Sequence, residues 1–183
     1  MNNVQWNDII FSDEKRFCLD GLENPIYAWS KKNKNHVLMK RHSGGGSIMV
    51  WVGIGFNMKS KIFILDNKYN SEKYVETLEK GLIPIISPGI IFQQDNAPIH
   101  VSKFTRNWLL TNNITTLNWP AMSPKLNIDE NVWATMSNDV YAHGKQFNSI
   151  VELQTSFIQS WNNINQDYVR NMYKSMYKRL LKL

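Results

Sequence analysis

One nearly uninterrupted apolar run, Ser-Ile-Met-Val-Trp-Val-Gly-Ile-Gly-Phe at residues 47–56, limits what this chain can fold into more than any other stretch. Its β-branched and aromatic residues favour a strand. Because polar residues do not alternate with the apolar ones, both faces of that strand should be covered. The chain has 183 residues, of which 43% are hydrophobic, so it can build the required core as one domain.

Other short β-rich runs predict further strands, and apolar residues at helical spacing predict helices later in the chain. The apolar run and the strand that follows it should form a hairpin joined by the turn at 57–60. Strands that first meet antiparallel and are later joined through helices imply an α/β fold, a mixed sheet with helices packed on it. The predicted strands are 8–19, 47–56, 61–66, 90–94 and 114–120, and the predicted helices are 70–86, 100–113, about 127–144, 148–164 and 166–183.

Helical spacing also predicts which side chains face the core. Ser71 can cap the helix at 70–86. The helix at 100–113 should turn Phe104, Trp108 and Leu109 to one side, and the next should turn Val132, Trp133 and Met136 inward. The last helix should bury an apolar stripe and leave a solvated basic face. The stripe is Val169, Met172, Tyr173, Met176, Tyr177 and Leu180, and the basic face is Arg170, Lys174, Lys178 and Arg179.

The charge balance favours a polyanionic partner such as nucleic acid. The formal net charge is +6, with 21 Lys and Arg against 15 Asp and Glu. A long connection at 21–46 ends in three glycines and carries a basic cluster: Lys31, Lys32, Lys34, Lys40 and Arg41. This connection is either a solvated loop or an arm that contacts DNA, where cations neutralise phosphates. The length of the connection favours the arm, because long loops inside compact domains are usually functional.

The cysteine content and the hydropathy pattern place the protein inside the cell. Cys18 is the only cysteine, so a disulfide within the chain is excluded and a reducing compartment is favoured. The first residues, MNNVQWNDII, lack the pattern of a signal peptide, and no run approaches the length of a membrane span. We therefore expect a soluble intracellular protein without a membrane partner.

Three acids on separate predicted elements are candidates for a metal site. Asp13 lies within the first strand, and Asp95 follows the strand at 90–94, where α/β folds place ligands. Glu130 lies in the first turns of a helix, and 34 residues separate it from Asp95, since 130 − 95 = 35. A helix, a short strand and a loop fit in that gap and can return the helix start to the sheet.

Carboxylates of this kind form a hard-oxygen site that suits Mg²⁺ or Mn²⁺. Two such ions, roughly 3.5–4 Å apart, can clamp the attacking and leaving oxygens of a phosphodiester displacement. The four histidines are scattered and the cysteine has no partner, which disfavours zinc. Asp129 is an alternative to Glu130. Successive helical residues point about 100° apart, so one of the two should face the metals and not both.

Four segments together resemble the catalytic domain of the Tc/mariner superfamily of DNA transposases. They are FSDEKRF, GGGSIMVWVGI, FQQDNAPIHVSK and LNWPAMSPKLNIDENVW, in the order and at the spacings of that family, over residues 6–140. The resemblance implies an RNase H-like fold with the catalytic, metal-binding triad Asp13, Asp95 and Glu130. Asn96 and His100 also match the family and would support Asp95.

The resemblance implies a function and partners as well. Members of the family cut DNA at transposon ends and join the 3′-hydroxyl to a TA target, with Mg²⁺ or Mn²⁺, two ions, and no small-molecule cofactor. The basic loop at 21–46 takes the place of the family's clamp loop, so a homodimer that acts in the nucleus is expected. The implied organisation is one catalytic domain over residues 1–183 with C-terminal helices at 145–183. Residues 1–8 leave no room for the family's helix-turn-helix modules, which are expected to be absent.

The chain departs from the family beside the third acid. The family reads Pro-Asp-Leu-Asn-Pro-Ile-Glu, whereas here Lys125 replaces an acid and Ile128 replaces a proline. The 34-residue gap and the Asn-Val-Trp that follows favour Glu130 as the ligand. Two alternatives stay open. One is a degenerate, catalytically inactive remnant that only binds DNA or dimerises, and the other is an RNase H-like nuclease that cuts RNA–DNA hybrids.

Overall fold

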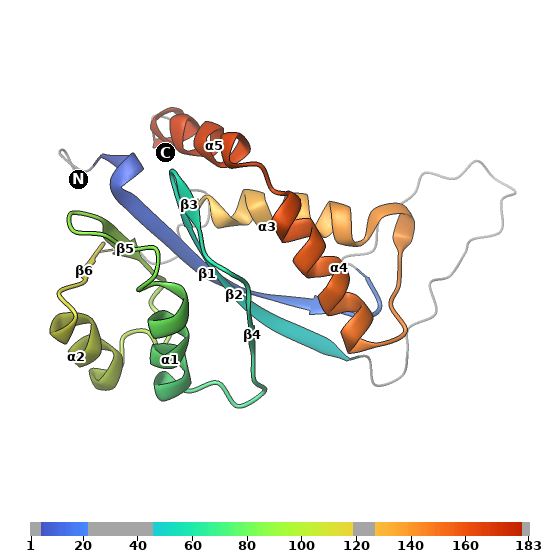
Figure 1. Ribbon diagram of the computed structural model, residues 1–183, viewed down its shortest axis with the longest axis horizontal. Coiled ribbons are helices and arrows are strands. Elements are labelled where there is room, and N and C mark those ends of the chain that lie inside the picture. The colour runs from blue at the N-terminus through green and yellow to red at the C-terminus, as the bar shows by residue number, and fades with distance from the viewer. Residues whose placement is uncertain (1–4, 22–45, 119–126, 181–183) are drawn as a thin grey trace, which may run out of the picture.

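The computed structural model describes residues 5–21, 46–118 and 127–180, without the side chains of 177–180. A central sheet is covered by helices on both faces (Figure 1), as the apolar run at 47–56 predicts. The five cations of the basic loop and residues 119–126 lie outside the described residues, and so do the side chains of Tyr177, Lys178, Arg179 and Leu180.

The sheet is mixed, as predicted. Its strands are β1 (Ile9–Cys18), β2 (Ser47–Gly55), β3 (Met58–Lys59), β4 (Phe63–Leu65), β5 (Ile91–Gln93) and β6 (Thr115–Thr116). The order across the sheet is β3-β2-β1-β5-β6, with β4 also paired to β2. β2 runs antiparallel to β1, β3 and β4. β5 lies between β1 and β6 and runs parallel to both. The long central strand β1 therefore joins the antiparallel half to the parallel half.

The hairpin predicted after β2 returns as two short strands instead of one. β3 lies within the predicted turn, and β4 covers only the middle of the predicted strand at 61–66. Between them, Ser60 Oγ accepts a hydrogen bond from the backbone N–H of Gly53 at 2.9 Å. A side-chain oxygen thus takes the place of a backbone carbonyl in the ladder, and regular pairing stops at that residue.

Successive side chains of β1 point to opposite faces of the sheet and pack in two separate hydrophobic cores. Ile9 and Phe11 face α3 (Asp129–Val140), α4 (Ile150–Asn163) and α5 (Gln166–Leu180), while Ile10 faces α1 (Ser71–Gly81) and α2 (Lys103–Thr111). Figure 1 shows the two helix groups on opposite sides of the sheet. The predicted stripe of α5 is buried at Val169, Met172, Tyr173 and Met176. In the part of the chain that the structure describes, no helix is long and apolar enough to cross a membrane.

Two predictions about helix starts are wrong. Asn70, not Ser71, caps α1, because its side chain accepts a hydrogen bond from the backbone N–H of Lys73. Helix α2 begins at Lys103, capped by Ser102, and not at His100. Within α2, Thr105 and Leu109 are buried one turn apart, whereas Phe104 is 51% exposed. The buried face therefore runs through the residue after Phe104, about 100° around the helix.

Lys59 fixes the C-terminal end of α4 against the sheet. Its Nζ donates hydrogen bonds to the backbone oxygens of Trp161 (2.6 Å) and Ile164 (2.9 Å) and lies 5.2 Å from the Trp161 ring centroid. The end of a helix presents unpaired carbonyls and a partial negative charge, which this ammonium satisfies.

We expect Lys59→Met to lower the free energy of unfolding by about 1–2 kcal/mol, since the Ile164 carbonyl loses its ammonium donor and the Trp161 carbonyl keeps only the Ile164 backbone N–H. Urea unfolding followed by circular dichroism measures the change. Lys68→Met, which removes an exposed ammonium, serves as the control and should be nearly neutral. Equal stability of the two variants would mean that Lys59 contributes nothing to the docking of α4.

Candidate active site

Asp13 lies in the middle of β1 on the face that packs against α3. Its Oδ2 accepts a hydrogen bond from Trp133 Nε1 at 3.0 Å, and its Oδ1 accepts one from the backbone N–H of Glu14 at 2.8 Å. Burial, together with the charges of Glu14 and Glu130, raises the pKa of Asp13 to about 7 despite the hydrogen bond from Trp133. The carboxyl is thus held in a fixed orientation within a cluster of negative charge.

Asp95 lies two residues beyond the end of β5, the strand that neighbours the one carrying Asp13. β1 and β5 pair in parallel, and the last pair of their register is Phe11 opposite Gln93. The Asp95 side chain is 59% exposed, at the carboxyl end of the strand. Two acids that are far apart in the sequence are therefore carried by neighbouring parallel strands, Asp13 within β1 and Asp95 just beyond β5.

Glu130 and Asp129 both belong to the first turn of α3, but they have different surroundings. Glu130 is exposed, and it lies one turn before Trp133, whose ring bonds Asp13. Asp129 is fully buried, and among the described residues neither of its carboxyl oxygens has a hydrogen-bond partner. Burial, with the charges of Asp13 and Glu130, raises the pKa of Asp129 well above its usual range. Of the two acids, only Glu130 is exposed where a solvated ion could reach it.

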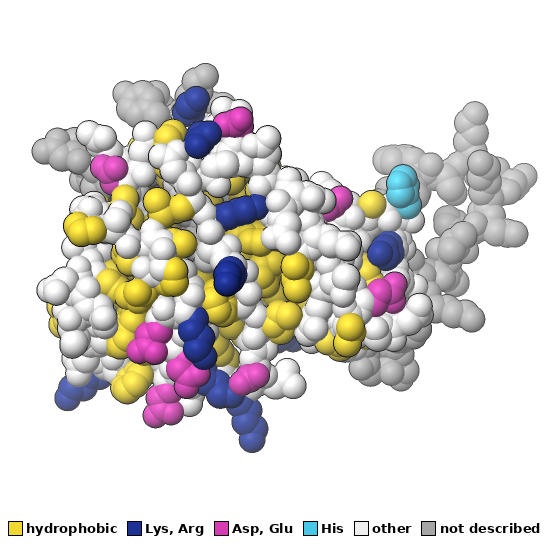
Figure 2. Space-filling view, viewed as in Figure 1, with side chains coloured by type: hydrophobic (Ala, Val, Ile, Leu, Met, Phe, Trp, Pro, Cys, Tyr) yellow, Lys and Arg dark blue, Asp and Glu magenta, His cyan; other side chains and the backbone are white. Residues whose placement is uncertain are grey.

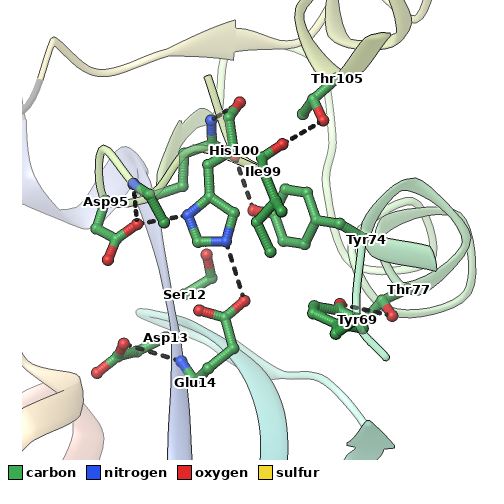
Figure 3. Close-up of polar contacts among 12 residues, drawn as sticks. Ser12, Asp13, Glu14, Tyr69, Tyr74, Thr77, Asp95, Ile99, His100 and Thr105 are labelled. Carbon is green, nitrogen blue, oxygen red and sulfur yellow. Dashed lines mark hydrogen bonds and ion pairs between the residues drawn. The ribbon is translucent and has the colours of Figure 1, made fainter. Parts of the chain in front are cut away.

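His100 has a more specific place than the start of a helix. It is 3% exposed and bridges two carboxylates (Figure 3): Nδ1 lies 2.5 Å from Asp95 Oδ1, and Nε2 lies 3.2 Å from Glu14 Oε1. Carboxylates only accept, so both ring nitrogens donate and the imidazole is positively charged. Burial alone would lower the pKa of His100, but its bonds to Asp95 and Glu14 raise it to about 9. The bond from His100 in turn lowers the pKa of Asp95.

Glu14 and Tyr74 belong to this site but are absent from the sequence prediction. The Tyr74 ring packs on the His100 ring with centroids 4.2 Å apart, and its hydroxyl donates to Gln94 Oε1 at 2.7 Å. Strand alternation could have indicated Glu14, because adjacent acids on a strand point to opposite faces. Asn96, the other predicted supporting residue, lies exposed in the turn directly after Asp95.

The donor chemistry of the site fits a hard divalent cation. Asp13, Asp95 and Glu130 offer carboxylate oxygens, and the pKa of Asp13 is raised by burial and then by the nearby charges of Glu14 and Glu130, which a cation would offset. Among the described residues, Ala97 N–H and His100 both bond Oδ1 of the Asp95 carboxylate, and the side chain is 59% exposed. Within the described ranges, no three His, Cys, Asp or Glu side chains stand close enough to hold an ion already. An ion at this site would therefore have to draw the carboxylates together.

Comparison with known proteins gives sequence relatives of one kind. The family model described as DDE superfamily endonuclease matches residues 8–154. The chain is 36% identical over 189 residues to the Transposable element Tc3 transposase of Caenorhabditis elegans, covering 100% of this chain and 57% of that protein. It is 29% identical over 145 residues to the Tcb2 transposase of Caenorhabditis briggsae, covering 74% and 52%. The chain thus spans about half the length of the curated relatives it matches.

Solved structures share the fold at lower sequence identity. The crystal structure of the Mos1 Strand Transfer Complex superposes with a TM-score of 0.80 at 18% identity, covering 97% of this chain and 54% of that chain. The crystal structure of the catalytic domain of Mos1 mariner transposase superposes with a TM-score of 0.69 at 19% identity, covering 95% and 79%. The mixed sheet and its flanking helices are therefore the RNase H-like fold that the sequence predicts.

Proposed function

Because this chain belongs to the DDE superfamily endonucleases, as a transposase catalytic domain of the Tc/mariner kind, we propose that it cuts DNA at transposon ends and transfers the freed strand to target DNA. One arrangement supports the proposal for these residues. Asp13 and Asp95 are carried by the neighbouring parallel strands β1 and β5, and the hydrogen bond from Trp133 to Asp13 ties α3, whose first turn contains Glu130, to β1.

Asp13, Asp95 and Glu130 would hold Mg²⁺ or Mn²⁺, two ions in our proposal. Mos1 transposase, which has the same fold, has been solved as paired-end complexes with Mn and with Mg. Divalent ions, when bound, supply the charge that activates the attacking oxygen and stabilises the leaving one. The chain's own contribution is orientation. Trp133 fixes Asp13 through one hydrogen bond, and His100 fixes Asp95 through another.

Besides the metal site, where the cut phosphate would lie, the DNA partner of this chain would need cationic contacts elsewhere. On the face in Figure 2, Lys and Arg side chains lie in a broken row among acidic and hydrophobic ones, so the positive charge is not gathered into one patch there. The proposal of DNA contact therefore depends on Lys31, Lys32, Lys34, Lys40 and Arg41 in the clamp-like loop at 21–46.

We further propose transposon ends and a TA target as the DNA, a homodimer as the assembly, the nucleus as the location, and residues 1–183 as one catalytic domain.

Plasmid nicking by the full chain tests the proposed activity. With Mn²⁺ or Mg²⁺, supercoiled plasmid should convert to open circles, and EDTA should stop the conversion because the carboxylates alone cannot stabilise the leaving oxygen. A wild-type chain that retards DNA in a gel but never nicks it would instead support the inactive remnant. One observation favours this second candidate. Asp129, beside Glu130, is buried, and its carboxyl oxygens have no hydrogen-bond partner among the described residues.

Metal binding by Asp95 can be measured without DNA. We expect Mn²⁺ to release or absorb heat on binding to the wild-type chain, and Asp95→Asn to weaken that binding at least about 100-fold, because it removes an anionic ligand oxygen. Asp66→Asn, an exposed acid paired with Lys73 away from the site, should leave the binding isotherm unchanged. If Asp95→Asn also left it unchanged, Asp95 would not be a ligand.

A further inference from the structure

Glu14 lies beside Asp13 in the sequence but on the other face of β1. Strand alternation sends Asp13 toward Trp133 and α3, whereas Glu14 points toward Tyr74 of α1 and the turn before α2 (Figure 3). There its Oε1 meets His100 Nε2 at 3.2 Å, and its side chain is only 17% exposed. Burial of a carboxylate without a partner costs free energy, and the contact with His100 offsets that cost for Glu14.

His100, which joins Glu14 to Asp95, is held on every side. Its backbone N–H donates to Ala97 O at 2.9 Å, and its backbone oxygen accepts from Gln94 Nε2 at 3.1 Å. Tyr74, which is fully buried, covers one face of the imidazole. Both ring nitrogens are bonded as well, which fixes the orientation of the imidazole. The fixed imidazole in turn restrains the Asp95 carboxylate through the contact between Nδ1 and Oδ1.

Asp95 needs this support more than Asp13 does. Asp13 lies within a paired strand and is bonded at both oxygens, whereas Asp95 lies beyond β5 and is mostly exposed. Apart from His100, the hydrogen bond that restrains its carboxylate comes from the backbone N–H of Ala97, on the same oxygen. Without His100, the carboxylate of Asp95 could rotate away from the place where an ion would meet Asp13.

We propose that Glu14 is a positioning residue that acts through His100 to hold the Asp95 carboxylate in its metal-binding orientation. The proposal depends on the metal site proposed above, and it adds a role for a residue on the opposite face of the strand. Partners of this kind orient metal ligands in many proteins, and their loss weakens metal binding about 10- to 100-fold. The competing explanation is that the Glu14–His100 contact only stabilises the fold.

Mn²⁺ titration calorimetry on the full 183-residue chain separates these explanations. Glu14→Ala should weaken Mn²⁺ binding about 10- to 100-fold, because the ring loses its Nε2 partner. Glu14→Gln keeps an oxygen that can accept from Nε2 and should recover most of the affinity. Glu79→Ala is the matched control, since Glu79 also accepts a hydrogen bond from a ring N–H, that of Trp108 at 3.0 Å, but on the α1–α2 surface. It should bind Mn²⁺ like the wild type.

A double-mutant cycle tests whether Glu14 acts through His100. If it does, Glu14→Ala should have no further effect on Mn²⁺ affinity in a His100→Ala background. Equal losses in Glu14→Ala and Glu14→Gln would show that charge matters and the hydrogen bond does not, which overturns the proposal. Should His100→Ala fail to fold by circular dichroism, the comparison of Glu14→Ala, Glu14→Gln and Glu79→Ala still decides it.

The same titration distinguishes failure of this inference from failure of the metal site. Mn²⁺ binding that is lost in Asp95→Asn but unchanged in Glu14→Ala overturns the positioning role and leaves the metal site standing. A wild-type chain that binds no Mn²⁺ overturns both. Binding that weakens in Glu14→Ala, recovers in Glu14→Gln and stays intact in Glu79→Ala supports both.

Discussion

Glu130→Gln is expected to lower metal-dependent plasmid nicking by about 10³-fold, which corresponds to about 4 kcal/mol of lost transition-state stabilisation. Asp129→Asn, at the adjacent residue, is expected to retain nicking within a few-fold of the wild type. The physical reason is orientation. Glu130 is exposed beside Asp13, whereas Asp129 is buried in the core under α3 and cannot reach an ion in solvent.

Initial nicking rates of both variants in Mn²⁺ provide the measurement, with folding checked by circular dichroism. The two substitutions are matched, because each changes one carboxylate into an amide in the first turn of α3. The reverse result, loss in Asp129→Asn and activity in Glu130→Gln, would mean that α3 turns by about one residue when it binds metal. Our assignment of the third ligand would then be wrong.

The sequence already contains the signal that separates Asp129 from Glu130. Val132, Trp133 and Met136 are predicted to face the core, and the structure confirms that all three are buried. Asp129 lies three residues before Val132 and four before Trp133. Viewed down the helix axis, it therefore points in the same direction as the centre of that buried stripe. Glu130 lies at the edge of the stripe, so the helical phase favours it as the solvent-facing acid.

The strands next to Asp13 and Asp95 are equally predictable, because a short run of β-forming apolar residues, Ile-Ile-Phe, marks each of them. What the sequence does not determine is how the turn between Asp95 and α2 folds. Four residues separate Asp95 from His100, and the hydrogen bonds from His100 N–H to Ala97 O and from Gln94 Nε2 to His100 O turn the ring back to the strand end. Glu14 illustrates the same difficulty. Alternation predicts the face it occupies, but not that a ring from residue 100 arrives there.

The two faces of β1 therefore carry different parts of one site. In the proposed site, Asp13 is one ligand and α3 carries another, Glu130, while Glu14, His100 and Tyr74 support Asp95 from the opposite side. A strand between two cores allows this division, because residues 13 and 14 can be fixed by unrelated helices. The local environment of each carboxylate follows from that division, with Asp13 buried and Asp95 mostly exposed.

Asp129→Leu is expected to raise the free energy of unfolding at pH 7 by about 1–3 kcal/mol, an unusual result for a change beside a proposed metal ligand. The carboxyl of Asp129 is fully buried and both of its oxygens lack a hydrogen-bond partner in the described part of the chain, so leucine replaces an unsatisfied polar group with an apolar one. Urea unfolding of the wild type and the variant measures the difference. Asp139→Leu, an exposed site on the same helix, is the control and should change stability by no more than about 0.5 kcal/mol.

The advantage of Asp129→Leu should also grow with pH. Burial raises the pKa of Asp129 in the folded chain, whereas in the unfolded chain it stays near 3.8. Below that pH the group is protonated in both states, and ionisation costs nothing. As the pH rises above about 4, Asp129 ionises first in the unfolded wild type, which lowers the free energy of the unfolded state. The free energy of unfolding of the wild type therefore falls until the pH passes the pKa of Asp129 in the folded chain. A stability difference that is flat from pH 4 to pH 7, or that favours aspartate, would mean that the buried carboxyl is paired in solution.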